Sequence, residues 1–367
     1  MKFVCEKSAF QKEITFAQEI ISSRNSVSVI SNVFLEAEGS TLLIRATDIK
    51  IGFETRIPVE VLEAGSLTVF CDKLTGILAS IPEGTIEIEQ KDTRVSIKPS
   101  FKKAQFNLKT IASEQFPQLP DIDDDKFFSM SITDFKDMVT QTIFAVSDDE
   151  TRYFMNGVFF ERVEEGLVMV ATDGRRLAYI KRPITEGIPD FKGIIIPPKV
   201  LSIIMHRAPS EGLLELAVTD KNLFVKFGMY RLSTVLIEGQ FPNYQKVIPE
   251  NQQYDLIVKK QDLLEALKRV AIFVEQKSRR TYMALSGDKL VVSSEESDIG
   301  TAREELICEY EGPEALIAMN YKYIEEPLKA IDAAQIRIRF TETSRALTML
   351  PEPAQDYFHI LMPMQPD

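Results

Sequence analysis

The chain repeats itself, and this repetition constrains the fold of its 367 residues more than any other feature. Two segments, NVFLEAEGSTLLIRATDIKIGFETRIPV and NGVFFERVEEGLVMVATDGRRLAYIKRPI, each contain two alternating runs divided by a turn, then Ala-Thr-Asp, then a third run. Three pairs of positions share one offset of 125 residues: Thr47 and Thr172, Phe116 and Phe241, and Phe10 and Phe135. Three coincidences at one offset indicate a true internal repeat.

A third, fainter copy begins at Arg280, where RTYMALSGDKLVVSSEESDIGTAREELI has the same turn and the same alternating runs. Solenoid repeats have periods of about 20–50 residues, so copies of about 120 residues predict three whole domains. Pro-containing polar stretches without periodicity, at 111–126 and 237–253, predict the linkers between them. We therefore expect domains at 1–125, 126–252 and 253–367.

Each copy has the order helix, strands, second helix, strands. Apolar residues at helical spacing predict first helices at 7–22, 133–146 and 261–274. Second, shorter helices are expected at 72–80, 197–206 and about 320–331. Alternating runs with Asp-rich turns predict the strands. The predicted fold class is α+β: three similar domains, each with two helices on one face of antiparallel sheets.

Composition excludes several classes of protein. Apolar residues make up 44% and charged residues 27%, which is typical of a globular chain. No run approaches the ~18 apolar residues of a membrane helix, and Glu6 and Lys7 interrupt any signal peptide. The isolated Cys5, Cys71 and Cys308 predict neither a disulfide framework nor a local metal site, and suit a reducing cytoplasm.

No motif of a nucleotide-binding, metalloprotease or serine hydrolase site occurs in the sequence. The acidic runs Asp123–Asp125 and Asp148–Glu150 could hold Mg²⁺, which keeps an enzyme as an alternative hypothesis. They fall in linker and helix-end contexts, where solvated carboxylates are usual. We expect no catalytic residue, no metal and no cofactor.

The net charge of −12 argues, by itself, against binding to nucleic acid. The charge is unevenly distributed, however, since the six helical segments with their flanks sum to +6 and leave −18 elsewhere. Local field matters more to DNA than net charge, so a basic helical face on an acidic protein is compatible with DNA binding. The alternative is that the helices carry Lys only for solvation. Most of the excess lies in the third copy, at 259–280.

Four segments, ATDGRRLA (171–178), MNGVFFE (155–161), FPNYQKVIP (241–249) and HILMPM (359–364), resemble the bacterial DNA polymerase III beta subunit, the DNA sliding clamp. The resemblance covers the whole chain and its three-copy architecture. It implies a non-catalytic processivity factor that forms a head-to-tail homodimer, a ring of six domains around duplex DNA without sequence readout. The implied partners are the replicative polymerase catalytic subunit, the clamp loader, and other clamp-binding polymerases and repair proteins, in the cytoplasm and without a membrane.

The resemblance also implies site residues. Contacts to the DNA backbone are expected from Arg24, Lys73, Arg152, Tyr153 and Lys199. Arg24 and Arg152 are expected directly after the ends of the first helices of copies one and two. Asp149 differs from the uncharged polar residue that the family suggests beside Arg152.

A hydrophobic pocket for partner peptides is implied between the second and third copies. The Asp-Gly pair within ATDGRRLA first predicts a hairpin turn, and a rigid turn can also form the rim of such a pocket. The last strand could instead be merely buried, and the ending Gln365-Pro366-Asp367 departs from the family pattern. The implied pocket residues are Met155, Thr172, Gly174, Arg175, Leu177, Pro242, Val247, Asn320, Tyr323, Ile360, Leu361, Met362, Pro363 and Met364.

The expected dimer interface joins opposite ends of the chain. FKKAQFNLK (101–109) alternates as a strand with basic residues nearby, and the third copy has an acidic cluster, which suits a heterologous contact. The alternative is an ordinary strand edge protected by Lys, and a protein-binding scaffold that never encircles DNA also stays open. The expected interface residues are Lys102, Lys103, Phe106, Leu108, Ile272, Phe273, Glu295, Glu296, Asp298, Glu304 and Glu305.

Overall fold

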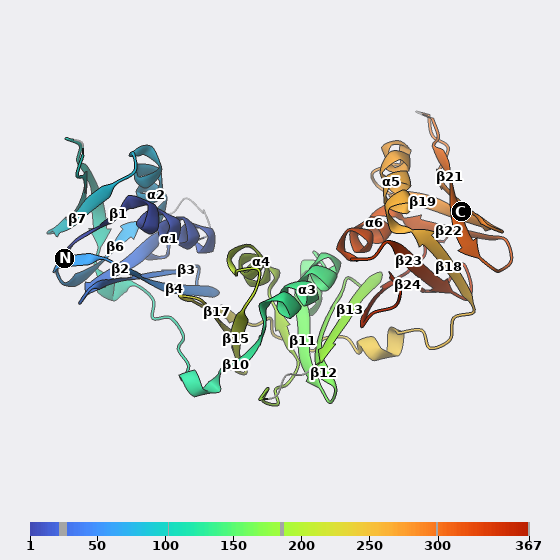
Figure 1. Cartoon of the computed structure of the whole chain (residues 1–367), viewed down its shortest axis with the longest axis horizontal. Coiled ribbons are helices and arrows are strands. Elements are labelled where there is room, and N and C mark those ends of the chain that lie inside the picture. The colour runs from blue at the N-terminus through green and yellow to red at the C-terminus, as the bar shows by residue number, and fades with distance from the viewer. Residues whose placement is uncertain (22–27, 102, 184–186, 299, 366–367) are drawn as a thin grey trace. The chain divides into compact units, whose positions relative to one another are not determined.

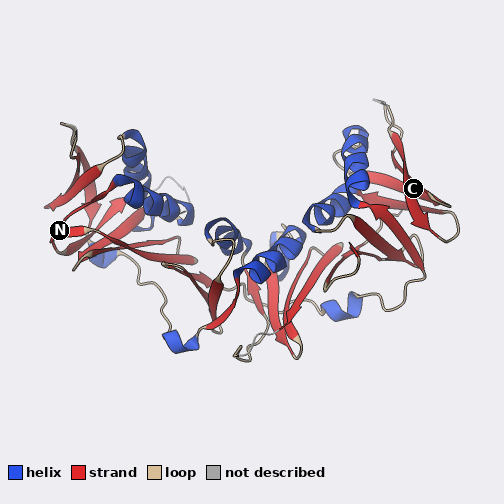
Figure 2. Ribbon diagram, viewed as in Figure 1, coloured by secondary structure: helices blue, strands red, loops and turns tan. Residues whose placement is uncertain are grey.

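The computed structural model describes residues 1–21, 28–101, 103–183, 187–298 and 300–365. It divides into two compact units: unit 1 comprises Met1–Ser131 and Ala208–Leu236, and unit 2 comprises Ile132–Arg207 and Ile237–Asp367. The middle third of the chain contributes to both units. Each unit is built on one antiparallel sheet with helices packed against it (Figures 1 and 2).

Unit 1 contains a 13-stranded sheet in the order β10-β15-β16-β17-β4-β3-β2-β6-β9-β8-β7-β1-β5. Helices α1 (Lys7–Ile20) and α2 (Cys71–Ser80) pack against each other and against this sheet. Its strands are β1 (Lys2–Glu6), β2 (Asn32–Glu38), β3 (Thr41–Thr47), β4 (Ile51–Pro58), β5 (Glu60–Glu63), β6 (Gly65–Phe70), β7 (Thr85–Lys91), β8 (Arg94–Pro99), β9 (Phe106–Ile111), β10 (Phe128–Ser131), β15 (Leu213–Val218), β16 (Asn222–Phe227) and β17 (Tyr230–Val235). Three short 3₁₀ helices complete the unit: η1 (Val29–Ser31), η2 (Ser113–Gln115) and η3 (Asp124–Lys126).

Unit 2 contains a 12-stranded sheet in the order β14-β11-β12-β13-β25-β24-β23-β18-β21-β20-β19-β22. Its strands are β11 (Val158–Val163), β12 (Gly166–Thr172), β13 (Arg176–Pro183), β14 (Ile194–Ile196), β18 (Tyr254–Lys259), β19 (Arg280–Ser286), β20 (Lys289–Ser294), β21 (Arg303–Tyr310), β22 (Ala315–Asn320), β23 (Gln335–Phe340), β24 (Leu347–Glu352) and β25 (Tyr357–Leu361). Its helices are α3 (Ile132–Thr142), α4 (Pro198–Arg207), α5 (Lys260–Val270) and α6 (Tyr321–Ala330), with 3₁₀ turns η4 (Ile143–Ala145), η5 (Glu150–Met155), η6 (Tyr244–Val247) and η7 (Ala271–Phe273). The α-helices lie together on one side of the strands (Figure 2).

The helices form where apolar residues recur at helical spacing, and each buries that stripe against its sheet. Phe10, Ile14 and Ala17 of α1 are fully buried, as are the corresponding apolar positions of α3 and α5. The predicted second helices agree with the structure to within one residue at each end. Pro198 occupies the first turn of α4, where its missing N–H is not needed.

The predicted ends of the first helices were wrong. Helix α3 ends at Thr142 and α5 at Val270, and each is followed by a 3₁₀ turn, η4 or η7, instead of continuing. Such tightened turns are common where a helix ends and its last carbonyls lack partners. Helix α1 ends at Ile20, and part of the predicted segment 7–22 lies outside the described residues.

The two units join successive copies in the same way. In unit 1, β4 of the first copy pairs antiparallel with β17, the last strand of the second, with Gly52 opposite Ser233. In unit 2, β13 of the second copy pairs antiparallel with β25, the last strand of the third, with Leu177 opposite Ile360. At both junctions between copies, the first in unit 1 and the second in unit 2, the fourth strand of one copy therefore hydrogen-bonds to the last strand of the next.

Two strands that occupy the equivalent positions in the repeat, β21 and β9, are only partly paired in the described part of the chain. Strand β21 is the fourth strand of the third copy, and its residues 303–307 pair only with β20 among the described residues. Strand β9 is the last strand of the first copy, and in the described part of the chain its residues 106–109 pair only with β8. Strands β9 and β21 thus each keep a half-open edge in the described part of the chain.

The structure shows no helix, within its described residues, that is long and apolar enough to cross a membrane. All three cysteines are buried and free of disulfides, and burial raises the pKa of the Cys5 and Cys71 thiols to about 12.

Candidate functional site

The segment Thr172–Arg176 forms a tight turn that its own side chains fix. Thr172 Oγ1 donates to the Arg176 carbonyl at 2.6 Å and accepts from Gly174 N at 3.0 Å. Asp173 Oδ1 accepts from the amides of Arg175 and Arg176 at 2.9 and 3.0 Å. Gly174 has φ +85°, a conformation that favours glycine, and a Cβ there would lie 2.8 Å from Arg152 Nη1. The predicted turn is confirmed, and its backbone is rigid.

Arg176 ties this turn to two other elements of unit 2. Its guanidinium pairs with Asp173, forms an ion pair with Glu326 of α6, and donates to the Phe144 carbonyl of η4 at 2.6 Å. It also lies 4.8 Å from the centroid of the Tyr323 ring. With only 10% of its side chain exposed, Arg176 positions the turn and is not itself a free surface cation.

An apolar cavity of about 200 Å³ opens beside this turn. Leu177 and Ile360, which face each other across β13 and β25, are buried and form its floor. Met362 and Val247, which are 43% and 55% exposed, stand at its rim. The residues that line it are Met155, Thr172, Gly174, Arg175, Arg176, Leu177, Pro242, Asn243, Tyr244, Val247, Ile360 and Met362.

Packed aromatic side chains support this cavity from below. Tyr244 is buried, and its hydroxyl donates to Glu161 Oε1 at 2.6 Å. The rings of Tyr179 and Phe358 stack at 4.8 Å across β13 and β25, and Phe159 stacks on Phe241 at 4.7 Å. Because this cluster is already packed, the cavity walls are preformed and an entering apolar group need not create them.

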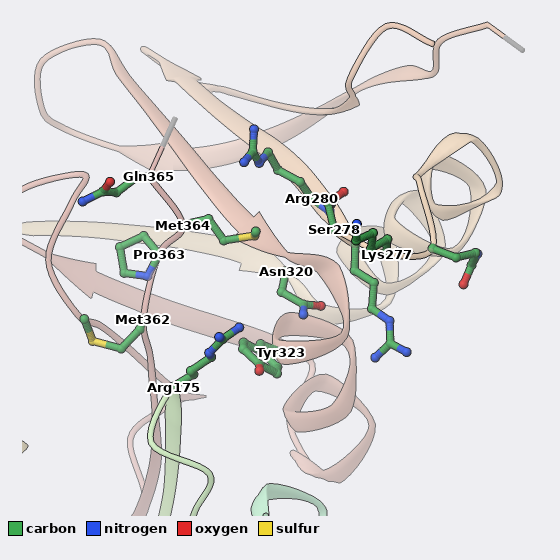
Figure 3. A pocket seen from close by; sticks show the side chains of 12 residues that line it. Arg175, Lys277, Ser278, Arg280, Asn320, Tyr323, Met362, Pro363, Met364 and Gln365 are labelled. Atoms are coloured by element: carbon green, nitrogen blue, oxygen red, sulfur yellow. Dashed lines mark hydrogen bonds between the residues drawn. The ribbon is translucent and has the colours of Figure 1, made fainter. Parts of the chain in front are cut away.

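A second cavity, of about 610 Å³, lies next to the first and shares Arg175 and Met362 with it. The C-terminal segment 362–365 forms one wall, and Ser278 and Arg280 lie on the other (Figure 3). Its described lining residues are Arg175, Gln276, Lys277, Ser278, Arg279, Arg280, Asn320, Tyr323, Met362, Pro363, Met364 and Gln365. The two cavities together form an apolar pocket with a polar, basic extension.

Of the 14 predicted pocket residues, the structure places 13 around these two cavities. Leu361 is the exception, because its side chain is 2% exposed and packs inside unit 2. The prediction omitted Arg176, Asn243 and Tyr244, although all three belong to the motifs ATDGRRLA and FPNYQKVIP. It also omitted Gln365 and the segment 276–280, for which no motif gave a signal.

Comparison with known proteins decides the family. Models of the DNA polymerase III beta subunit match three successive parts of the chain: the N-terminal domain at residues 1–120, the central domain at 129–243 and the C-terminal domain at 245–365. The chain belongs to the DNA polymerase III beta subunit family. Proteins of this family are sliding clamps, non-catalytic processivity subunits of the DNA polymerase III holoenzyme, and the chain has their DNA-clamp fold.

Individual relatives agree over the full length. The beta sliding clamp of Treponema pallidum is 44% identical over 369 residues, and that of Escherichia coli K12 is 26% identical over 368 residues, with 100% of each chain covered. A solved structure of the Pseudomonas aeruginosa sliding clamp bound to griselimycin is similar with a TM-score of 0.93 and 26% identity, again over 100% of both chains. The Bacillus subtilis clamp, at 24% identity and a TM-score of 0.94, shows the same fold.

The predicted DNA contacts of this clamp chain lie on several elements. Arg24 lies outside the described residues, Lys73 is exposed on α2, and Lys199 is the second residue of α4. Arg152 and Tyr153 lie within η5, so the expectation that Arg152 directly follows the end of a helix was wrong. The 3₁₀ turns η4 and η5 intervene after α3 ends at Thr142. Their role in DNA binding stays a prediction.

Asp149 has a structural role beside Arg152. It begins η5 by accepting from the Thr151 amide at 3.0 Å and from Thr151 Oγ1 at 2.6 Å, and it accepts from Arg152 Nε at 2.9 Å. The hydrogen bonds from Thr151, together with Arg152, lower the pKa of the Asp149 carboxyl. The carboxylate therefore stays charged and offsets part of the positive charge of Arg152. Within the acidic run Asp148–Glu150, Asp149 is thus engaged in capping, and no group of three or more His, Cys, Asp or Glu side chains that could hold a metal ion occurs among the described residues.

The helices carry less of the basic charge than the sequence segments suggested. Within the bounds that the structure gives, the six described α-helices contain 11 Lys and Arg and 9 Asp and Glu, a net charge of +2. The excess in the third copy comes mainly from Lys277, Arg279 and Arg280, which follow η7 and line the second cavity. This charge therefore belongs to the lining of the second cavity and not to a helix.

Four of the predicted interface residues lie on the two half-open strands: Phe106 and Leu108 on β9, and Glu304 and Glu305 on β21. Phe106 and Leu108 are half-buried on one face of β9, Ile272 of η7 is 72% exposed, and Phe273 is half-buried beside it. The strand begins at Phe106 and not at 101 as expected, and the Phe101 ring lies next to Gly84, outside the ladder. Lys103 is exposed, and Lys102 lies outside the described residues.

The acidic cluster of the third copy is already partly neutralised within unit 2. Glu304 pairs with Arg269 through two hydrogen bonds of 2.9 and 2.5 Å, Glu305 lies 2.9 Å from Lys289, and Glu295 lies 3.5 Å from Arg280. The other two predicted members of the cluster, Glu296 and Asp298, are exposed. Charge attraction to Lys102 and Lys103 is therefore weaker than the sequence alone suggests.

Proposed function

We propose that two copies of this clamp chain close head-to-tail into a ring around duplex DNA, and that each copy tethers partner proteins through the apolar cavity beside Thr172–Arg176. The proposed tethering of partner proteins rests on this apolar cavity. Its floor is apolar and preformed, and its rim offers two partly exposed apolar side chains, Met362 and Val247. Its partners would be the replicative polymerase catalytic subunit, the clamp loader, and other polymerases and repair proteins that work on DNA in the cytoplasm.

The chemistry of the cavity suits a short apolar peptide. Burying an aliphatic or aromatic side chain against Leu177 and Ile360 contributes about 1.5–3 kcal/mol. Met362 adapts its shape to different ligands, so one pocket can serve several partners. Arg175 and Asn320 supply a guanidinium and an amide at the rim, which can bind backbone carbonyls and amides of the peptide. An anchor of this kind typically dominates the affinity of a small interface.

The ring follows from the rule that joins the copies. The fourth strand of one copy pairs with the last strand of the next at both junctions within the chain, and the strands of these two kinds that stay half-open are β21 and β9. A second copy can supply β9 to β21, and its own β21 then receives β9 of the first, which closes the assembly. The Phe106 and Leu108 face of β9 would then meet Ile272 and Phe273.

The repeat also predicts the register of this contact. Ser293 of the third copy occupies the repeat position of Ala171 in the second. Ser293 pairs with Arg303 and Ala171 pairs with Ala178, so Arg303 corresponds to Ala178. In the same way, Phe106 pairs with Ile97 on the preceding strand as His359 pairs with Met349, so Phe106 corresponds to His359. Because Ala178 lies opposite His359 in the second junction, Arg303 of one chain is expected opposite Phe106 of the partner, and Ala302 opposite Asn107.

Contacts to DNA in such a ring should be few and weak. Each phosphate that a Lys or Arg neutralises adds salt-sensitive affinity, and many tight contacts would prevent sliding. Arg24, Lys73, Arg152, Tyr153 and Lys199 are the proposed contacts. The partial neutralisation of Arg152 by Asp149 fits a clamp that must move along its substrate.

Topological loading tests the ring. The chain is loaded onto nicked circular DNA with its clamp loader, and retention is measured by gel filtration before and after a single linearising cut. A ring stays on the circle and is lost from the linear molecule by sliding off the ends. Equal retention on both molecules would show binding without encirclement and would favour the scaffold alternative. The mass of the purified protein in solution provides the parallel check, since a ring requires two chains.

A further inference from the structure

The second cavity of unit 2 has a charge opposite to that of the chain. Four cations, Arg175, Lys277, Arg279 and Arg280, line it, and none of its described lining residues is Asp or Glu. The chain as a whole has a net charge of −12. Concave basic sites concentrate anionic ligands even on acidic proteins, because the local field, and not the net charge, acts on the ligand.

The backbone that carries these cations is held in place. Arg279 has φ +54°, in the left-handed region that is uncommon for residues other than glycine. Its N–H donates to the Glu275 carbonyl at 2.8 Å, and its carbonyl accepts from Tyr321 N at 3.0 Å, at the start of α6. Arg280 then pairs with Asn320 in the ladder of β19 and β22. Less-favoured backbone conformations that the surroundings enforce are frequent at ligand sites.

The four cations differ in how far the chain itself neutralises them. Arg280 lies 3.5 Å from Glu295, and only 14% of its side chain is exposed. Lys277 is exposed, Arg279 is half-exposed, and within the described parts of the chain neither forms an ion pair. Lys277 and Arg279 are therefore the cations most available to a ligand, while Arg280 contributes to the wall.

We propose that this cavity binds acidic residues that flank the apolar anchor of a partner peptide; the proposal rests on the peptide-binding function proposed above. The two cavities share Arg175 and Met362, so a peptide seated in the apolar cavity reaches the basic one without crossing other structure. Among partners with similar apolar anchors, those with more acidic flanking residues would then bind with higher affinity. Such rim contacts favour fast, salt-sensitive association.

The lining favours a polypeptide over single-stranded nucleic acid. Proteins that bind single strands combine basic grooves with aromatic side chains on which the bases stack. Tyr323 is the one aromatic residue among the described residues that line the cavity, and the Arg176 guanidinium lies 4.8 Å from its ring centroid. Asn320, Ser278 and Gln276 instead offer amide and hydroxyl groups suited to a peptide backbone.

Fluorescence anisotropy with synthetic peptides tests the proposal. The core probe is the shortest segment of the polymerase catalytic subunit from the same cells that binds the wild-type chain. It is extended by three Glu or three Gln residues, at either end. The test variant is Lys277→Glu with Arg279→Asp, because Asp tolerates the left-handed backbone. The matched control, Lys50→Glu with Lys126→Glu, changes the net charge equally at exposed positions of unit 1.

We expect one Glu-extended peptide to bind wild type about tenfold more tightly than its Gln counterpart at low salt, and within about twofold at ~0.5 M salt. The test variant should lose this preference but bind the core probe normally, and the control should keep it. Equal affinities for Glu and Gln peptides, or a preference that survives in the test variant, would overturn the proposal. So would tighter binding of oligothymidine than of the acidic peptide at this cavity. Failure of every polymerase segment to bind wild type would overturn the peptide pocket as well.

Discussion

Acidification should weaken unit 2 through a single buried imidazole. His359 lies in β25, 1% exposed, with its ring 5.3 Å from that of Phe144 and 6.0 Å from that of Tyr357. Burial, and secondarily the positive charge of Arg176, lowers the pKa of His359 to about 3. In the unfolded chain the pKa of a histidine is about 6.5. Between these values the unfolded state binds more protons, so the free energy of unfolding falls as pH falls.

The size of the effect follows from the two pKa values. Stability from neutral His359 is fully present above about pH 6.5, and each pH unit below that removes about 1.4 kcal/mol until the folded pKa is reached. Lowering the pH from about 7.5 to about 5 should therefore cost about 2 kcal/mol from this residue alone.

Urea unfolding of wild type, His359→Leu and His206→Leu at the two pH values isolates the contribution of His359 to the change in the free energy of unfolding. Other groups also titrate, so the informative quantity is the difference between variants. His359→Leu should lose about 2 kcal/mol less than wild type on acidification. His206, exposed on α4, is the matched control and should behave as wild type. An unchanged pH dependence in His359→Leu would refute the reasoning and show that carboxylates alone set the acid response.

Further predictions concern the interface, the pocket and the turns. Ala302→Cys with Asn107→Cys should form intermolecular disulfides on mild oxidation, seen as dimers on non-reducing gels; neither single variant should do so, and the native cysteines are buried. Charge reversal of Lys102 and Lys103, or Phe106→Ser, should shift the dimer to folded monomer in sedimentation, and unchanged sedimentation of the combined variant would remove this interface. Deleting Met362–Asp367, or Met362→Ala with Met364→Ala, should cost about 2 kcal/mol of peptide affinity, roughly 30-fold, with the dimer and melting temperature retained; normal binding would reduce these residues to packing. Gly174→Ile should cost about 1–2 kcal/mol of stability at φ +85°, whereas Ile49→Gly, at φ +79° in the first copy, should be neutral or stabilising by thermal melting.

The sequence was informative wherever a local pattern decides the structure. Helical spacing located the first helix of each copy, and the ATDGRRLA turn could be predicted because Asp and Gly favour that geometry locally. In the first copy the same turn forms with Ile49 in place of Gly174: Asp48 Oδ1 accepts from Ile51 N at 2.7 Å, as Asp173 Oδ1 accepts from Arg176 N. The side-chain hydrogen bonds of Thr-Asp therefore fix the turn more than glycine does.

What the sequence did not reveal depends on distant contacts. Lys277 and Arg279 were counted with a helix because they follow one, but the hydrogen bond from Tyr321 N to the Arg279 carbonyl attaches them to the start of α6. The acidic cluster seemed available as a block, yet Arg269 on α5 and Lys289 on β20 neutralise two of its members. These contacts could not be predicted without knowing which helices and strands are neighbours in the fold.

The repeat explains why the apolar cavity forms at one junction. At the second junction the outward-facing pairs across the joined strands are Leu177 with Ile360 and Tyr179 with Phe358, all apolar or aromatic. At the first junction the pairs at the same positions are Gly52 with Ser233 and Glu54 with Arg231. The cavity there, of about 410 Å³, is accordingly lined by Arg45, Arg56 and Arg231 with carboxylate partners.

The strand pairing is therefore common to both junctions, and only the side chains that it presents differ. Backbone hydrogen bonds join the copies without regard to sequence, so the outward-facing positions could change without loss of the junction. An apolar anchor needs a desolvated, hydrophobic floor, which Leu177 and Ile360 provide and which Gly52 and Ser233 do not. At the proposed junction between chains, Ala302 would face Asn107, again without a large apolar pair. One repeated architecture thus carries the proposed peptide site at its second junction, where the joined strands present an apolar floor and the basic extension lies alongside.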